Sequence, residues 1–143
     1  MNKIECVARI PLFQGFPQRL LRKIATFCVE RAYPAGELLC QQGSARGIGL
    51  FFIVEGKVEV FGAARGGREK RLALLGPGEV VGEMMLLDRS PRSASVRAIS
   101  DVLCYLMPEW DFRRLLKDYP EIAVRMLPAL AARIRELDRT VLG

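Results

Sequence analysis

GEMMLLDRSPRSASV, residues 82–96, is the segment from which both the fold and the ligand of this chain are predicted. Gly82 follows an apolar pair and opens a short turn, where backbone N–H groups are free to receive a phosphate. Arg92 adds a planar fork of donors that matches two phosphate oxygens. Glu83 cannot help to bind an anion, because a carboxylate only accepts hydrogen bonds, so a ribose hydroxyl is its natural partner. Together these groups predict a nucleotide monophosphate as the ligand.

This segment resembles the phosphate-binding cassette of cyclic nucleotide-binding domains, the superfamily of the catabolite activator protein and other cyclic-nucleotide sensors. The family pattern is roughly F-G-E-[LIM]-A-L-L, a variable loop, then [PE]-R-[STA]-A-[ST]-V. Residues 81–87 and 91–96 match its charged and small positions. Two positions depart from it: Val81 stands where an aromatic residue or isoleucine is common, and Met85 replaces a usual small residue.

The resemblance implies a 3′,5′-cyclic nucleotide as the ligand. Glu83 would accept a hydrogen bond from the ribose 2′-OH, and Arg92 would pair with the cyclic phosphate, helped by nearby backbone N–H groups. The cassette positions that the resemblance assigns to the ligand are Val81, Gly82, Glu83, Met84, Met85, Arg92, Ser93 and Ala94.

Residues outside the cassette are assigned to the base by the same resemblance. Val60, Leu72 and Ala73 correspond to strand residues that flank the purine, although core packing explains Val60 and Leu72 equally well. Arg133 and Leu137 fall where relatives cap the base from a terminal helix, which makes them candidate lid residues.

The identity of the purine turns partly on Ser93. A hydroxyl here can reach the 2-amino group of a syn guanine, but serine also occurs in relatives that bind cAMP, so this residue does not decide. We favour cAMP over cGMP, and another anionic ligand such as a cyclic dinucleotide stays open.

Length and composition indicate one globular domain over residues 1–143. It would comprise an N-terminal helical part over 1–30, a β-roll over 31–107 with the cassette at 82–96, and C-terminal helices over 108–143. No apolar run approaches the ~20 residues of a membrane helix, and the N-terminus lacks the apolar stretch of a signal peptide. We therefore expect a cytoplasmic protein without a membrane partner.

The ionisable residues argue against an enzyme and against a metal site. The chain has no histidine, and its four cysteines lie far apart in the sequence, which excludes the usual zinc patterns and catalysis by histidine. We expect no catalytic residue, no metal and no cofactor. The net charge of +6 comes from basic residues spread along the chain, so a nucleic-acid partner is the minor option.

The middle of the chain predicts a mainly β fold. Short apolar or alternating segments, separated by glycine turns, are typical of an antiparallel sandwich or barrel. The segments expected as strands are 38–40, 50–54, 57–61, 69–75, 79–81, 93–98 and 101–107. The family fold implied is a β-roll or jelly roll of about eight strands, with N-terminal helices, a short cassette helix and two C-terminal helices.

Helical spacing marks the two ends of the chain. Residues 2–10 and 18–29 are the N-terminal candidates. Pro108 is expected as the first residue of the next helix, with Trp110 and Phe112 packing it. An apolar stripe along 121–142 predicts the last helix, and Pro128 within it should kink that helix. Such a stripe can cover its own domain, close a pocket or pair with a second copy.

The prediction for function is a cyclic-nucleotide sensor that signals by moving its C-terminal helix. Partners would be the cyclic nucleotide and either a second copy or an unidentified protein. Because the sequence has no winged helix-turn-helix after residue 143, we expect no direct binding to nucleic acid. The alternatives are an interaction or dimerisation module that keeps the fold without the ligand, and part of a transcriptional regulator.

Overall fold

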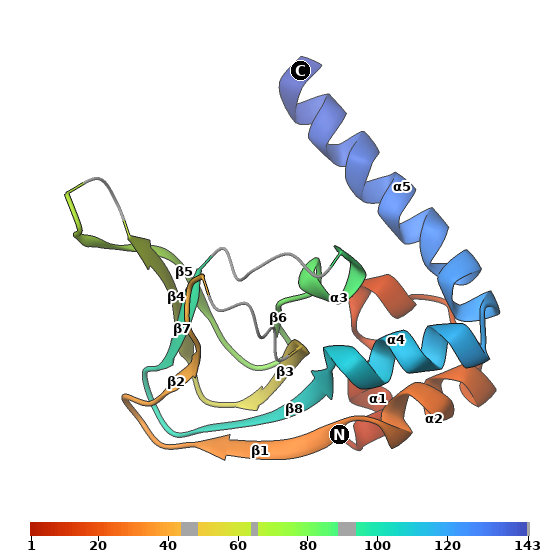
Figure 1. Ribbon diagram of the computed structural model, residues 1–143, viewed down its shortest axis with the longest axis horizontal. Coiled ribbons are helices and arrows are strands. Elements are labelled where there is room, and N and C mark those ends of the chain that lie inside the picture. Colours follow the sequence, from red (N-terminus) through yellow and green to blue (C-terminus); the bar gives the residue numbers. More distant parts are fainter. Residues whose placement is uncertain (44–48, 64–65, 89–93, 143) are drawn as a thin grey trace.

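The computed structural model describes residues 1–43, 49–63, 66–88 and 94–142, and within them eight strands form two four-stranded antiparallel sheets. One sheet has the order β1-β8-β3-β6 and the other the order β2-β7-β4-β5 (Figure 1). This confirms the predicted antiparallel β-roll. The strands are β1 Val29–Tyr33, β2 Leu38–Cys40, β3 Gly49–Glu55, β4 Val58–Ala63, β5 Glu69–Leu75, β6 Val80–Val81, β7 Ser95–Ala98 and β8 Val102–Pro108.

Helices lie at both ends of the chain and gather on one side of the roll, while the C-terminal helix extends away from it (Figure 1). None of the described helices is long and apolar enough to cross a membrane. The helices are α1 Lys3–Ala8, the 3-10 turn η1 Pro11–Phe13, α2 Gln18–Thr26, α3 Met85–Asp88, α4 Glu109–Asp118 and α5 Glu121–Leu142.

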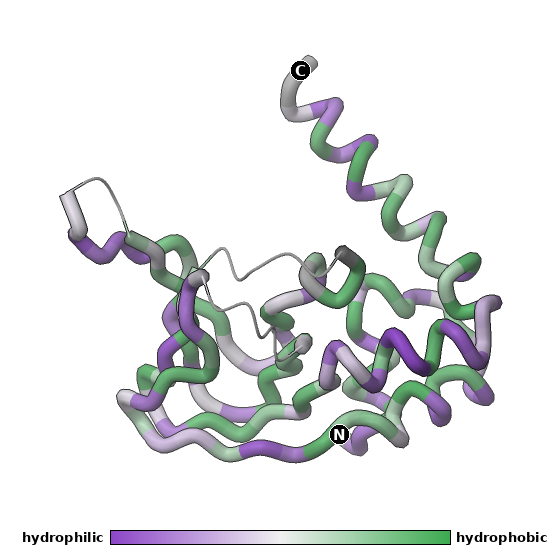
Figure 2. The backbone as a smooth tube through the Cα atoms, in the orientation of Figure 1, coloured by the Kyte–Doolittle hydropathy of each residue, from purple (hydrophilic) through white to green (hydrophobic). Residues whose placement is uncertain are grey.

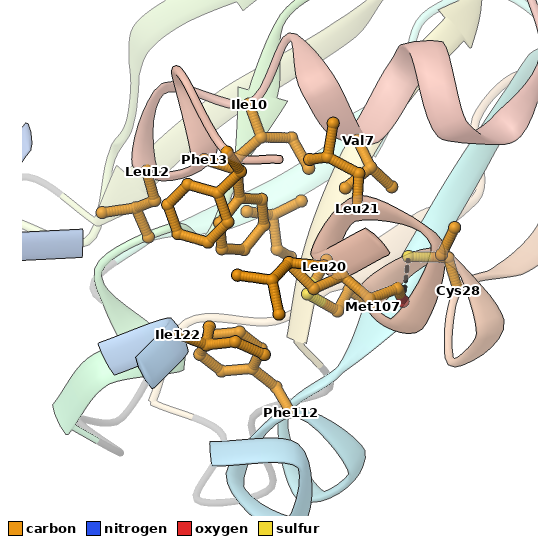
Figure 3. Close-up of a cluster of buried hydrophobic side chains, with 14 of the residues drawn as sticks. Val7, Ile10, Leu12, Phe13, Leu20, Leu21, Cys28, Met107, Phe112 and Ile122 are labelled. Atoms are coloured by element: carbon orange, nitrogen blue, oxygen red, sulfur yellow. Dashed lines mark hydrogen bonds between the residues drawn. The ribbon is translucent and has the colours of Figure 1, made fainter. Parts of the chain in front are cut away.

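The central strand β3 is buried on both of its faces, which explains its unbroken apolar run. Leu50 and Phe52 belong to a core cluster shared with the helices, whereas Phe51 and Ile53 belong to a second cluster shared with the other sheet. Successive side chains of a strand point to opposite faces. The sheet that contains β3 is therefore a middle layer between the helices and the second sheet, and Figure 3 shows the cluster on its helical side.

The boundaries of several elements differ from the predicted ones. The segment Val29–Tyr33 is the edge strand β1, which is absent from the predicted strands, and only its first residue falls in a predicted helix. The three middle residues of β1 are exposed and polar or small, so the segment lacks an alternating apolar pattern. Pro108 is not the first residue of a helix. It has an extended ψ of 137° and pairs with Gly49 at the end of β8. It is therefore the N-cap residue that precedes α4.

Gly36, Gly43, Gly56 and Gly78, which lie in the turns of the roll, have a positive φ. Gly56 has a φ of +88°, and a Cβ atom placed on it would lie 2.2 Å from the carbonyl oxygen of Asp101. A larger residue there would meet both the unfavourable φ and this contact. The β3–β4 turn therefore requires glycine.

The apolar residues of α4 and α5 are only partly buried. Trp110 is 71% exposed, so the prediction that it packs α4 is wrong, whereas Phe112 is fully buried. In α5, Ile122 and Met126 are buried, but Ile134 and Leu137 are 60% and 62% exposed. The first half of the stripe thus covers the chain's own core. The second half lies on the part of α5 that leaves the roll (Figure 2).

The buried thiols predict a loss of stability at alkaline pH. Burial raises the pKa of Cys28 to about 12 and that of Cys104 to about 11, and the Cys28 thiol donates to the Ile24 carbonyl (3.6 Å, Figure 3). An unfolded thiol titrates near ~8.5. Because the folded pKa is the higher one, the stabilising contribution is complete below ~8.5 and is lost as the pH rises toward the folded values.

We therefore expect the free energy of unfolding to fall from pH ~8.5 upward, by at most about 1.4 kcal/mol per pH unit for each buried thiol. The replacement Cys28→Ala should make this fall shallower, since one of the contributing titrations is removed. Urea unfolding of both proteins at several pH values between 8 and the folded pKa of Cys28 checks this. Parallel pH curves for the two proteins would contradict it.

Candidate functional site

A tight turn between β6 and α3 holds the residues that the sequence singled out. Val81 ends β6, where it pairs with Phe51 of β3, and Gly82 follows with a φ of +87°. The backbone then enters α3, which begins at Met85. The Leu86 side chain is fully buried in the core cluster on the helical side of the middle sheet. The turn is thus anchored by a strand on one side and by the core on the other.

Glu83 lies in this turn with only 8% of its surface exposed, although it is a carboxylate. Its Oε1 atom accepts a hydrogen bond from Nη2 of Arg133, which comes from α5, fifty residues later. A second nitrogen of the same guanidinium, Nη1, lies 3.4 Å from the Met84 sulfur. One arginine of the C-terminal helix therefore holds two consecutive residues of the turn.

The second carboxylate oxygen of Glu83 is buried and has no hydrogen-bond partner among the described residues. A buried polar atom left without a partner costs roughly 1–3 kcal/mol, and more when it is charged. Such an atom is a ready acceptor for the hydroxyl of a ligand. It is therefore the feature of the site that most directly calls for a ligand.

A second arginine holds the other end of the cassette helix. Arg113 of α4 donates through Nη2 to the carbonyl oxygen of Leu87 at 3.3 Å, and through Nε to Glu109 at 2.7 Å. Both side chains are largely buried. Arg113 was not predicted as a site residue. Its sequence signal is the Glu109–Arg113 pair four residues apart, which places an oriented guanidinium on the helix after the roll.

The structure brings some of the other predicted residues together. Val60 of β4 pairs directly with Ala73 of β5, and Val60 packs against the cluster between the sheets. Leu72 lies at an irregularity in this pairing and is 57% exposed. Leu137 is 62% exposed, whereas Arg133 reaches the turn. These geometries leave the base-binding roles of these residues as predictions.

The described residues include only part of the cassette. Arg92 and Ser93 lie outside the described residues. Ala94 is half-buried just before β7. The next residue, Ser95, is buried and its hydroxyl accepts from the Gln42 N–H at 2.8 Å, while the Gln42 side chain accepts from the Ala63 N–H at 3.0 Å. This chain of hydrogen bonds joins the exit of the cassette to β2 and β4.

The described part of the site offers a carboxylate oxygen as a hydrogen-bond acceptor. Within the described ranges, no three His, Cys, Asp or Glu residues are grouped so that they could hold a metal ion. The described cassette residues supply a buried carboxylate and a glycine turn. This arrangement suits recognition of a hydroxyl-bearing ligand.

Comparison with known proteins gives the family. The family model of the cyclic nucleotide-binding domain matches residues 30–119. The chain therefore belongs to this family of regulatory sensor domains. The chain is 38% identical over 128 residues to the cyclic AMP receptor protein of Thermus thermophilus, and the match covers 90% of this chain and 59% of that protein. It is 39% identical over 119 residues to a cyclic nucleotide-gated potassium channel of Mesorhizobium japonicum, covering 83% of this chain and 31% of the channel.

A solved structure agrees with this assignment. The N-terminal domain of a transcriptional regulator from Streptomyces coelicolor A3(2) superposes with a TM-score of 0.84 at 30% identity, covering 96% of both chains. The chain spans about three-fifths of the length of the cyclic AMP receptor protein.

Proposed function

We propose that this domain binds a 3′,5′-cyclic nucleotide and that Glu83 recognises the ribose. The observation that supports this most strongly is the buried Oε2 atom of Glu83, which has no partner among the described residues while Oε1 is held by Arg133. The ribose 2′-OH would donate to this oxygen. Arg92 would pair with the cyclic phosphate, because its fork of donors matches two phosphate oxygens.

We favour cAMP over cGMP as the ligand. The support is the similarity to a protein named as a cyclic AMP receptor protein. Ser93 does not distinguish the two, since its hydroxyl suits a guanine amino group without excluding adenine. Val60, Leu72 and Ala73 stay our candidates for the apolar contact with the base.

Signalling would proceed through α5. Arg133 joins this helix to the carboxylate that receives the ribose, so a ligand that moves Glu83 changes the contact that positions α5. The ligand can shift the helix only by as much as it prefers one arrangement to the other. The domain would therefore act as a sensor whose output is the position of α5, with Leu137 as a second lid residue.

Removal of a single ligand hydroxyl tests the role of Glu83. We expect the wild-type protein to bind cAMP at least about tenfold more tightly than 2′-deoxy-cAMP, since one hydrogen bond to a charged group is worth roughly 1.5–3 kcal/mol. In the Glu83→Ala variant the two ligands should bind with equal affinity. Isothermal titration of stripped protein with both ligands, and with cGMP, measures this.

Two further variants, titrated with the same ligands, test the contact with the phosphate. Arg92→Ala should lose affinity for all three ligands alike, because it removes a contact with the phosphate that they share, while Arg89→Ala in the same segment serves as the control. Equal binding of cAMP and 2′-deoxy-cAMP by the wild-type protein would contradict the role of Glu83. No binding of any cyclic nucleotide by folded protein would contradict the proposed function.

We also propose that α5 pairs with a second copy of the chain. Ile134 and Leu137 expose apolar side chains on the outer half of this helix, and Leu127 is 59% exposed nearer its start. An exposed apolar stripe of this kind is buried most simply by its own symmetry mate. We expect no direct binding of this chain to nucleic acid.

Sedimentation equilibrium tests the pairing. We expect the wild-type protein to be dimeric and Leu137→Glu to be monomeric, because a buried unpaired carboxylate opposes association. Leu74→Glu, which changes an exposed leucine of β5, is the matched control and should stay dimeric. A monomeric wild-type protein would rule the pairing out.

A further inference from the structure

The surface of α4 carries a hollow that the nucleotide site does not use. It has a volume of about 400 Å³ and is lined by Trp110, Arg113, Arg114, Lys117 and Asp118. All five residues come from one helix, and their spacing of three, four and seven residues places the first four on one face. Trp110, the single tryptophan of the chain, is 71% exposed there. Tryptophan is highly buried on average, so a ring this exposed, set in a hollow among other side chains, is a candidate contact for a partner.

The charge of the hollow indicates what would cover it. Three cationic side chains line it against one carboxylate, Asp118. Arg114 and Lys117 are exposed, and Arg113 is largely buried beside Glu109. The hollow therefore presents an excess of positive charge around an apolar ring, which complements a segment that carries carboxylates and an apolar residue.

We propose that this hollow, the α4 hollow, is a docking surface for an acidic segment of a partner protein. Tryptophan and arginine are the residues most enriched among the energetic centres of protein interfaces. Because the lining comes from a single helix, the hollow suits a chain segment lying across it more than an enclosed small molecule.

The α4 hollow is also joined to the cassette. Arg113, which lines it, donates to the Leu87 carbonyl oxygen at the end of α3. A partner that moves Arg113 would therefore act on the cassette helix, and by reciprocity a ligand in the cassette would change the affinity for the partner. This linkage rests on the proposed binding of a cyclic nucleotide, whereas the docking surface itself does not.

A peptide selection tests the docking surface. Random twelve-residue peptides displayed on phage are selected on the wild-type protein after depletion on the Arg114→Glu/Lys117→Glu variant. We expect the surviving peptides to combine Asp or Glu with an apolar residue. The emission of Trp110, the single tryptophan, then reports binding of the best synthetic peptide directly, with an affinity at least tenfold weaker in the charge-reversed variant.

Controls separate this result from general charge attraction. The variant Arg22→Glu/Lys70→Glu makes the same change of net charge at exposed positions on α2 and β5 and should bind the peptide as the wild-type protein does. A selection that yields no acidic peptides overturns the proposal. So does equal binding to the two charge-reversed variants, or saturable binding of an oligo(dT) probe in place of the peptide.

The linkage to the cassette has its own readout. In protein shown to bind cAMP, the peptide affinity should differ at least threefold with and without saturating cAMP, and Arg113→Lys, which keeps the charge but loses the fork of donors, should remove the difference. An unchanged affinity in such protein overturns the linkage. A protein that binds the peptide but no cyclic nucleotide would contradict the proposed function and leave the docking surface standing.

Discussion

A buried carboxylate needs hydrogen-bond partners for both of its oxygens. Glu83 has a partner for one oxygen, Arg133, which lies fifty residues later in the sequence. Arg133 neutralises the buried charge and satisfies Oε1, so the cassette turn and the C-terminal helix share one interaction. Removing either member would leave the other without compensation, which is far more costly than never having placed the pair there. The position of α5 and the state of the cassette are therefore tied together.

That interaction works only because both of its ends are held. Leu86 fixes the cassette helix in the core, and Arg113 holds the carbonyl of Leu87 from α4. At the other end, Ile122 anchors the start of α5 in the same core, and Arg19 of α2 forms a two-point ion pair with Glu121 at 2.6 and 2.8 Å. The guanidinium of Arg19 holds the pKa of Glu121 below its usual value. Arg133 thus joins two elements that are each anchored to the core at one end.

The roll could be predicted from the sequence because its strands are short, apolar or alternating, and separated by glycine turns, so each carries a local signal. The edge strand β1 could not, since an exposed polar strand such as Val29–Tyr33 has no apolar pattern. The turn around Glu83 was predictable because its chemistry is local. The resemblance placed Arg133 near the site, but its contact with Glu83 depends on how α5 crosses the cassette. The exposure of Trp110 could not be predicted, because helical spacing alone does not tell which apolar residue of a helix faces the core.

The link between the cassette and α5 can be measured directly by electron spin resonance on labels at Lys70→Cys and Asp138→Cys, both exposed positions on β5 and α5. The four native cysteines are buried, and dilution with unlabelled protein restricts the measurement to distances within one chain. We expect saturating cAMP to change the distance distribution in the wild-type protein and to leave it unchanged in Arg133→Ala at equal occupancy. Identical distributions with and without cAMP in the wild-type protein would contradict the coupling of Glu83 to α5.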